Sequence, residues 1–137
     1  MAERADRGLI ERGERIRREV LGDAYVEANL ATADDFMMVF QDLVNQIPWG
    51  LSWARASIDR KTRCLVTIGI LGALGRPDEL KTYAKAAIGL GATPDEIADV
   101  LAQVMAYCGA PAGRQSFLAV HAALVEAGAL PAKPDGA

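Results

Sequence analysis

The sequence predicts an all-α protein with about six helices, folded as a single domain over residues 1–137. Apolar residues recur every three or four positions, which is the period of a helix with one buried face. No long stretch keeps the alternation of apolar and polar residues that is typical of strands. Proline and glycine fall between the periodic segments, where they separate one helix from the next. A length of 137 residues fits one domain.

The composition argues against several classes of protein. Hydrophobic residues make up 51% and charged residues 24% of the chain, as in globular proteins. The net charge of −3 argues against nucleic acid as a partner, and no apolar run reaches the ~18–20 residues of a membrane span. The single histidine excludes a metal site with several histidine ligands in one chain. Two cysteines and a charged N-terminal segment without a secretory pattern lead us to expect a cytoplasmic protein.

Residues 1–20 are dense in arginine and glutamate and predict a charged N-terminal helix or arm. Glu14 and Arg18 lie four residues apart, in the order that favours a helix. The apolar stripe of this segment is thin, so we expect it to be solvated or to lie across a neighbouring subunit.

A second helix is predicted to begin at residues 32–35, which resemble a capping box, and to end before Pro48. Residues 48–57 are expected to form a loop that carries both tryptophans, Trp49 and Trp53. The apolar residues of the helix follow the pattern of a core-facing stripe, and they are Phe36, Val39, Phe40, Leu43, Val44 and Ile47.

The third helix is predicted over residues 58–74, with Ser57 as its cap and Asp59 in its first turn. It is charged at its start and apolar afterwards, and a helix that is apolar on all sides is expected to be buried. A chain of 137 residues has little surface with which to cover such a helix, so we expect a homo-oligomer.

The last three helices are predicted over residues 78–90, 94–108 and 112–127. The first of them follows Pro77, which suits a first helical position, and one face of it carries Leu80, Tyr83, Ala84, Ala87 and Ile88. Thr93 and Glu96 give the strongest start signal, with threonine as the N-cap, proline at the first helical position and glutamate at the third. Cys108 and His121 lie on the apolar stripes of their helices, so we expect both to be buried. The tail over residues 129–137 is expected to be loose.

Residues 49–63 combine two tryptophans with several basic side chains, which suits a small carboxylated molecule. The planar fork of an arginine pairs with a carboxylate, and an indole ring gives a flat apolar wall. Trp49, Trp53, Arg55 and Arg63 are the candidates. In the alternative interpretation, the tryptophans anchor the segment to the core and the arginines are solvated.

Glu79 and Tyr83 lie four residues apart and therefore on one helical face. A carboxyl group and a phenol at the edge of an apolar pocket can transfer protons if burial shifts their pKa values. In the alternative interpretation, Tyr83 is a core residue whose hydroxyl bonds a carboxylate. The sequence contains no CxxC pair, phosphate-binding glycine loop, nucleophile elbow or metal-ligand cluster.

The chain contains a set of motifs that occur together in one family: REVLGDAY at 18–25, WGLSWAR at 49–55, DRKTR at 59–63, LGR at 74–76, GATPDEI at 91–97 and YCGAPA at 107–112. Over residues 15–127 the sequence resembles the carboxymuconolactone decarboxylase family, in its γ-carboxymuconolactone decarboxylase branch. The wider superfamily includes the alkylhydroperoxidase D-like proteins. The resemblance implies an all-α fold of about six helices, a homo-oligomer (a trimer or a hexamer), and no organic cofactor or metal.

The resemblance also implies loss of CO₂ from a small carboxylated unsaturated lactone. The electron pair left on carbon can spread through a conjugated C=C bond to the lactone carbonyl. Such a site needs an apolar wall, hydrogen-bond donors and an acid that protonates carbon. Trp49 and Trp53 would form the wall, and Arg55 or Arg63 would hold a second carboxylate of the substrate.

Three positions depart from the family pattern. Glu79 matches, but Tyr83 stands where decarboxylases carry histidine; Gln46 stands where they carry glutamate, and Cys64 replaces a small serine. Arg76 and Glu79 occupy the two cysteine positions of the peroxidase relatives, which argues against dithiol peroxidase chemistry. We therefore expect Glu79 and Tyr83 to be catalytic. The expected substrate-binding residues are Trp49, Trp53, Arg55, Arg63, Gln46 and Cys64.

The leading interpretation is a cofactor-independent carboxy-lyase. Tyrosine and glutamine favour hydrogen bonding over proton abstraction, which leaves open an isomerase, dehydratase or cyclase that acts on a larger polyketide-like acid. A further alternative is a non-catalytic oligomeric binding protein. Thiol redox chemistry would require Cys64 and Cys108 to meet in space.

Overall fold

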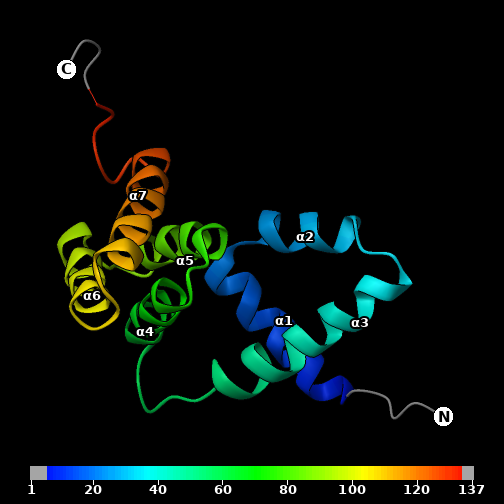
Figure 1. Ribbon diagram of the computed structural model, residues 1–137. Coiled ribbons are helices and arrows are strands. Elements are labelled where there is room, and N and C mark those ends of the chain that lie inside the picture. The colour runs from blue at the N-terminus through cyan, green and yellow to red at the C-terminus, as the bar shows by residue number, and fades with distance from the viewer. Residues whose placement is uncertain (1–5, 134–137) are drawn as a thin grey trace. The chain divides into compact units, whose positions relative to one another are not determined.

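The computed structural model describes residues 6–133, and helices dominate this range (Figure 1). No strand occurs between these residues, so the all-α class is confirmed. The chain divides into two compact units, Met1–Arg60 and Lys61–Ala137. The first five residues of the N-terminal segment and the last four of the expected loose tail lie outside the described residues.

Within the described range, seven α-helices and one π-helical segment follow in the order α1 (Arg7–Leu21), α2 (Asp23–Ala31), α3 (Asp35–Val44), η1 (Asn45–Ser52), α4 (Arg60–Leu74), α5 (Pro77–Gly89), α6 (Pro94–Cys108) and α7 (Ala110–Glu126).

In the first unit, α1 packs against η1 at a close backbone crossing. Gly13 is buried, and a Cβ atom added there would overlap the backbone oxygen of Asn45. A Cβ atom on Gly50 would lie 2.6 Å from the backbone oxygen of Leu9. The Arg12 guanidinium donates two hydrogen bonds, of 2.8 and 3.1 Å, to the Gly50 carbonyl. The described part of the N-terminal segment is therefore a packed helix of this unit, and the expectation of a solvated arm is wrong.

The chain remains helical through Pro48, where we expected the helix to end. The Trp53 N–H donates to the Pro48 carbonyl at 2.8 Å, five residues back. This wider turn is the π-helical geometry, which occurs as a short interruption of α-helices. The expected loop over residues 48–57 is helical as far as Ser52, so backbone hydrogen bonds hold the tryptophan segment.

The short helix α2 was not predicted, and it changes the role of Thr32. Thr32 is the C-cap of α2, while Asp34 is the N-cap of α3. The Asp34 carboxylate accepts a hydrogen bond from the Met37 N–H at 2.9 Å. An aspartate at this position satisfies an N–H that the helix itself leaves without a partner.

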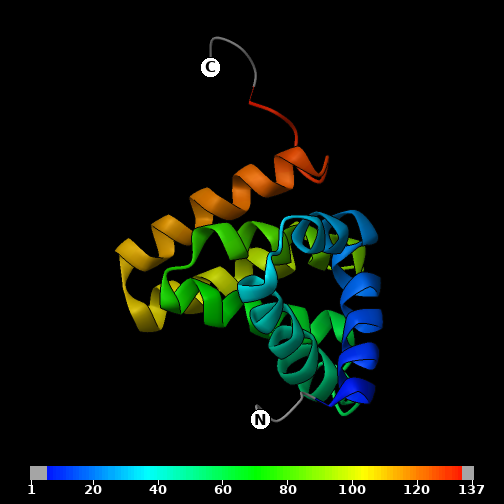
Figure 2. The same ribbon diagram turned by 90° about the vertical axis from the view of Figure 1, so that its right-hand side faces the viewer.

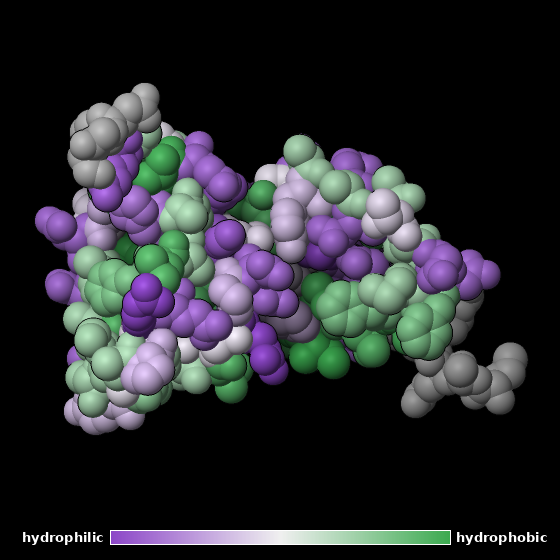
Figure 3. Space-filling model, turned by 45° about the horizontal axis from the view of Figure 1, so that its top comes forward, coloured by the Kyte–Doolittle hydropathy of each residue, from purple (hydrophilic) through white to green (hydrophobic). Residues whose placement is uncertain are grey.

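Helix α3 turns polar residues toward the interior of the first unit. Arg17, which is only 4% exposed, donates to Gln41 Oε1 at 2.8 Å and to Asn45 Oδ1 at 3.3 Å. The apolar stripe that we expected in the core is exposed instead, as at Phe36 and Phe40. The prediction of a core-facing stripe is wrong here because the bonds to Arg17 fix which side of α3 faces α1. Apolar side chains, drawn in green, accordingly reach the molecular surface (Figure 3).

Helix α4 buries one side of itself. Its buried residues, Cys64, Ile68 and Gly72, are spaced four apart, while Val66 and Ile70 on the opposite side are half exposed. The expectation that this helix is buried on all sides is therefore wrong for the single chain. The helix begins at Arg60, so Asp59 stands directly before its first residue instead of in its first turn, and Ser57 lies farther upstream.

Helix α7 lies along α5 and α6 in the second unit (Figure 2). The predicted stripe of α5 is confirmed, with Leu80 and Ala84 buried. The predicted capping box of α6 is also confirmed. The Glu96 N–H donates to Thr93 Oγ1 at 3.1 Å, and the Thr93 N–H donates to Glu96 Oε1 at 3.0 Å.

Two residues that we expected in the core are exposed. Cys108 is the last residue of α6, and the chain turns at Gly109 (φ 94°) directly after it. His121 points outward because α7 buries a neighbouring stripe that includes Val120 and Leu124. Small residues complete this stripe, so α7 packs closely along a side that excludes the imidazole.

Candidate active site

The two tryptophans of the first unit form a stacked pair. Their ring centroids lie 4.6 Å apart, with an angle of 23° between the ring planes. The π-helical turn places Trp49 one turn before Trp53, and the two side chains are 1% and 6% exposed. Offset-stacked rings of this kind give a rigid apolar surface. Burial to this degree also fits the anchoring role that we considered as the alternative.

Gln46 and Arg55 lie on either side of this pair in the sequence. Gln46 is half-buried, and its Oε1 atom is buried with no hydrogen-bond partner among the described residues. A buried acceptor without a donor is costly, so it is a place where a ligand or a water molecule would bind favourably. Arg55 is exposed, and its backbone N–H donates to the Ser52 carbonyl at 3.1 Å.

The basic first turn of α4 is largely engaged in ion pairs. Arg60 pairs with Glu19 at 2.7 Å, and Lys61 pairs with Glu96 at 2.9 Å. The hydrogen bond from Lys61, followed by that from the Thr93 backbone, lowers the pKa of Glu96. Arg63 is half-buried. Two of the four basic residues of the segment are therefore paired with carboxylates of the protein.

Cys64 and Tyr83 connect α4 to α5. The Cys64 thiol donates a hydrogen bond to the Tyr83 backbone carbonyl at 3.3 Å. Cys64 is completely buried, and this burial raises the pKa of its thiol to about 12. A thiol in this state is protonated at neutral pH and is not a nucleophile. Because Cys108 is exposed and neither cysteine is in a disulfide, the thiol redox interpretation loses its support.

Glu79 and Tyr83 occupy successive turns near the start of α5. Glu79 is exposed in the first turn, and Tyr83 is half-buried. Pro77 stands in the first turn as predicted, and Arg76 is the N-cap. The fixed helical spacing keeps the carboxylate and the phenol on the same side of α5.

The eight expected site residues divide evenly between the two units. Trp49, Trp53, Gln46 and Arg55 belong to the first unit, and Arg63, Cys64, Glu79 and Tyr83 belong to the second. The structure brings together the stacked tryptophans in the first unit and Cys64 with Tyr83 in the second.

The sequence analysis missed one polar cluster, which consists of Arg17, Gln41 and Asn45 in the first unit. All three residues are buried. A signal for it exists, because Arg17 lies between the apolar residues Ile16 and Val20 of α1. Gln41 of α3 and Asn45 at its C-terminal end are also spaced four apart, and hence lie on one helical face.

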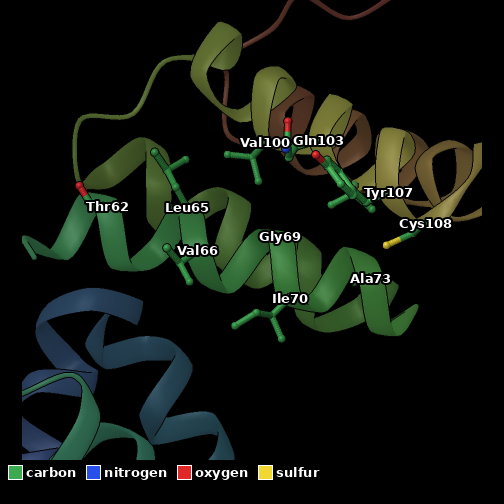
Figure 4. A pocket seen from close by; sticks show the side chains of 11 residues that line it. Thr62, Leu65, Val66, Gly69, Ile70, Ala73, Val100, Gln103, Tyr107 and Cys108 are labelled. Carbon is green, nitrogen blue, oxygen red and sulfur yellow. The ribbon is translucent and has the colours of Figure 1, made fainter.

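The second unit also has hollows of its own. An apolar groove of about 520 Å³ runs between α4 and α6 (Figure 4). A hollow of about 600 Å³ lies between α5 and α7, with Lys81 and Arg114 among its lining residues. A smaller one, of about 200 Å³, lies between α6 and α7 beside His121.

Neither a metal centre nor a membrane span is found in the part of the chain that the structure describes. Residues 6–133 contain no group of three or more histidine, cysteine, aspartate or glutamate side chains placed to hold a metal ion. In the same range, no helix combines the length and the apolar character needed to cross a bilayer.

Comparison with known proteins confirms the resemblance seen in the motifs. The model of the carboxymuconolactone decarboxylase family matches residues 39–133. A protein of Acinetobacter baylyi named 4-carboxymuconolactone decarboxylase is 34% identical over 128 residues, which cover 93% of this chain and 96% of that protein. A protein of Metarhizium robertsii named nitrosuccinic acid decarboxylase is 36% identical over 105 residues, which cover 77% of this chain and 73% of that protein. The chain therefore belongs to the carboxymuconolactone decarboxylase family.

Proposed function

We propose that this protein is a cofactor-independent decarboxylase that releases CO₂ from a small carboxylated unsaturated lactone or a related activated acid. The observation that carries the proposal is the 34% identity, over 93% of the chain, to a protein named 4-carboxymuconolactone decarboxylase. The second relative is named for a different acid, nitrosuccinic acid. The two names share the loss of CO₂, so the reaction is the better supported part of the proposal and the lactone the narrower part.

Both named acids suit decarboxylation without an added electron sink. In the unsaturated lactone the carboxylated carbon adjoins a C=C bond that is conjugated to a carbonyl group, and in nitrosuccinic acid it carries a nitro group. The C–C bond to the carboxylate breaks, CO₂ leaves, and the electron pair spreads into the carbonyl or the nitro group. A proton from an acid then forms the new C–H bond. The balance is one carboxylate and one proton in, and one CO₂ and one C–H bond out, without oxidation or reduction.

We assign the proton transfer to Tyr83 and Glu79. A phenol carries a proton that it can donate, so Tyr83 can supply the proton to carbon. Glu79 lies one turn earlier on α5 and is exposed, so it can exchange protons with the solvent. In this arrangement, Tyr83 is the acid, and Glu79 helps to pass a proton from the solvent back to Tyr83 after each turnover.

We assign substrate binding to the other six predicted residues. Trp49 and Trp53 supply an apolar wall that desolvates the carboxylate that leaves. Arg55 or Arg63 would hold a second carboxylate, away from the first, since a cation beside the leaving group would stabilise the ground state. The remaining two are Gln46, with its buried acceptor oxygen, and Cys64, which acts through its hydrogen bond to Tyr83.

We further propose that the protein works as a homo-oligomer of the family type, a trimer or a hexamer. The exposed apolar sides of α3 and α4 support self-association, because monomeric proteins rarely leave continuous apolar faces in water.

The test is a CO₂-release assay with two substrates, 4-carboxymuconolactone generated in situ and nitrosuccinic acid, each with about 1 μM and about 10 μM enzyme. Release in proportion to the enzyme concentration from either acid supports the decarboxylase assignment. Release from nitrosuccinic acid alone would reject the lactone as substrate and keep the reaction class. Intact recovery of both acids at the higher enzyme concentration would reject the proposal for these substrates.

A further inference from the structure

We propose that the apolar face of α3 docks into the α4–α6 groove of a second copy of this chain. The α3 face consists of Phe36, Val39, Phe40 and Leu43 of α3 together with Ile47 of η1, which continues the helix. The α4–α6 groove is lined mainly by Leu65, Val66, Ile70, Val100, Val104 and Tyr107. The proposal names the surfaces that the self-association needs, and it does not depend on the decarboxylation chemistry.

The α3 face is apolar and exposed because the opposite side of the helix is held by polar bonds. Gln41 and Asn45 accept hydrogen bonds from Arg17 inside the first unit. A surface helix of a monomeric protein normally has the reverse arrangement, with its apolar stripe inward. The exposed fractions are 82% for Phe36, 61% for Val39, 53% for Phe40, 45% for Leu43 and 54% for Ile47.

The charge around α3 selects a protein partner over a membrane surface. No lysine or arginine occurs from Glu19 through Ala54. Helices that bind the surface of anionic membranes carry lysine or arginine beside their apolar face. Here, Asp34 and Asp35 stand exposed at the start of the helix instead. An anionic lipid surface would repel this segment, whereas an uncharged protein groove would not.

The α4–α6 groove offers such a surface. Figure 4 shows that α4 supplies Leu65, Val66 and Ile70, and that α6 supplies Val100 and Tyr107. The floor is low at Gly69, where an added Cβ atom would meet only the Val100 side chain, at 3.4 Å. The groove contains no charged residue.

The two surfaces match in length and in the sizes of their side chains. The α3 face spans residues 36–47, the last three of which lie in η1, and the α4 side of the groove spans residues 62–73, so each covers eleven residue steps. At ~1.5 Å per residue, each is about 16 Å long. The α3 face presents two phenylalanine rings, and the groove presents small residues at Gly69 and Ala73, so large side chains of one surface meet small ones of the other.

The α3 face offers a large part of the area that an interface needs. Aromatic side chains bury roughly 150–250 Å² each, and Phe36 and Phe40 are 82% and 53% exposed. The two rings therefore offer on the order of 250 Å². The three aliphatic residues of the face add to this area, toward the ~800 Å² per partner of a standard interface.

The test uses light scattering on size-separated protein, with one charged substitution on each surface. We expect the wild type at about 20 μM to be an assembly of two or more copies. Phe40→Glu and Ile70→Glu should each reduce the mass to that of one chain, with the helical circular dichroism unchanged. Leu118→Glu is the matched control, because Leu118 is an exposed leucine on α7 outside both surfaces; its mass should equal that of the wild type.

The mass of a mixture of the two variants is a second test, and it does not depend on how either variant behaves alone. Phe40→Glu retains an intact groove, and Ile70→Glu retains an intact α3 face. An equimolar mixture should therefore form a pair through one intact contact, while each variant alone does not. A wild type that is monomeric overturns the proposal. So does an Ile70→Glu protein that keeps the wild-type mass while Phe40→Glu dissociates, because that result places the partner of α3 elsewhere. Activity plays no part in this experiment, so its failure is distinct from failure of the decarboxylase assignment.

Discussion

The buried thiol of Cys64 donates a hydrogen bond to the backbone carbonyl of Tyr83 across 3.3 Å, and so ties α4 to α5. Cys64 has no exposed surface, and burial raises the pKa of the thiol to about 12. The proton that makes this bond is therefore retained throughout the neutral pH range. Two of the residues that we expected in the site are thus in direct contact.

The stability of the protein should fall at alkaline pH because of Cys64. The thiol ionises near 9.0 in the unfolded chain and near 12 in the folded one. The raised folded pKa adds stability that is fully present below pH 9 and is lost as pH rises from 9 to 12. The loss from this group approaches ~1.4 kcal/mol per pH unit. Urea unfolding of the wild type and of Cys64→Ser at pH 8.5 and pH 10.5 measures it. Equal losses in the two proteins would contradict the assignment.

Helix α1 should tolerate no side chain at Gly13. An added methyl group would meet the backbone of Asn45 and Gly50, which cannot rotate away. We expect Gly13→Ala to reduce the free energy of unfolding by about 2–3 kcal/mol. Gly89→Ala is the control, because nothing lies within 4 Å of an added Cβ there; it should change stability by no more than ~1 kcal/mol. Similar effects of the two substitutions in a denaturant titration would contradict the close crossing.

The Arg17 cluster should hold α3 against α1. Arg17→Met would leave the amide oxygens of Gln41 and Asn45 buried without these donors. An unsatisfied buried acceptor costs about 1–3 kcal/mol, so we expect a loss of about 2–4 kcal/mol in the free energy of unfolding. Arg18→Met, which removes ion pairs on the surface of α1, is the control and should have little effect. A smaller loss for Arg17→Met than for Arg18→Met would show that the cluster does not hold the helix.

Removal of the Tyr83 hydroxyl should slow catalysis without unfolding the protein. If the phenol protonates carbon, Tyr83→Phe should lower kcat by roughly 10²-fold, the scale of a lost general acid, while KM changes little. Tyr25→Phe, on the exposed side of α2, is the matched control and should retain wild-type kcat. Steady-state kinetics on an accepted substrate gives both values. Unchanged kcat in Tyr83→Phe would remove this residue from the proton transfer.

The sequence predicted the parts of the fold that local signals determine. The capping box at Thr93, the start of α5 at Pro77 and the buried stripe of α5 follow from side chains within one or two turns of each other, and the structure confirms them. The motif resemblance supplied the family because its residues are spread over most of the chain.

The predictions that were wrong concern features that residues far apart in the sequence determine. Periodicity showed that α3 has an apolar face, but the bonds from Arg17, 24 and 28 residues away, decide that this face points outward. In the same way, periodicity cannot show that the helix continues through Pro48 in π-helical form. The expected site residues could be named from the motifs, but their roles depend on the substrate, so they remain proposals.

The central claim is that the protein exchanges a carboxylate for a proton at carbon. The most direct measurement is ¹³C and proton NMR of the reaction in D₂O with carboxyl-labelled ¹³C substrate, because the ¹³C spectrum follows the labelled carboxylate and the proton spectrum follows the new bond at carbon. The account predicts one labelled CO₂ released and one deuterium installed on the carbon that lost it, per turnover. A product that retains the labelled carboxylate, as an isomerase, dehydratase or cyclase would leave it, or a substrate that is bound and recovered unchanged, would contradict the claim.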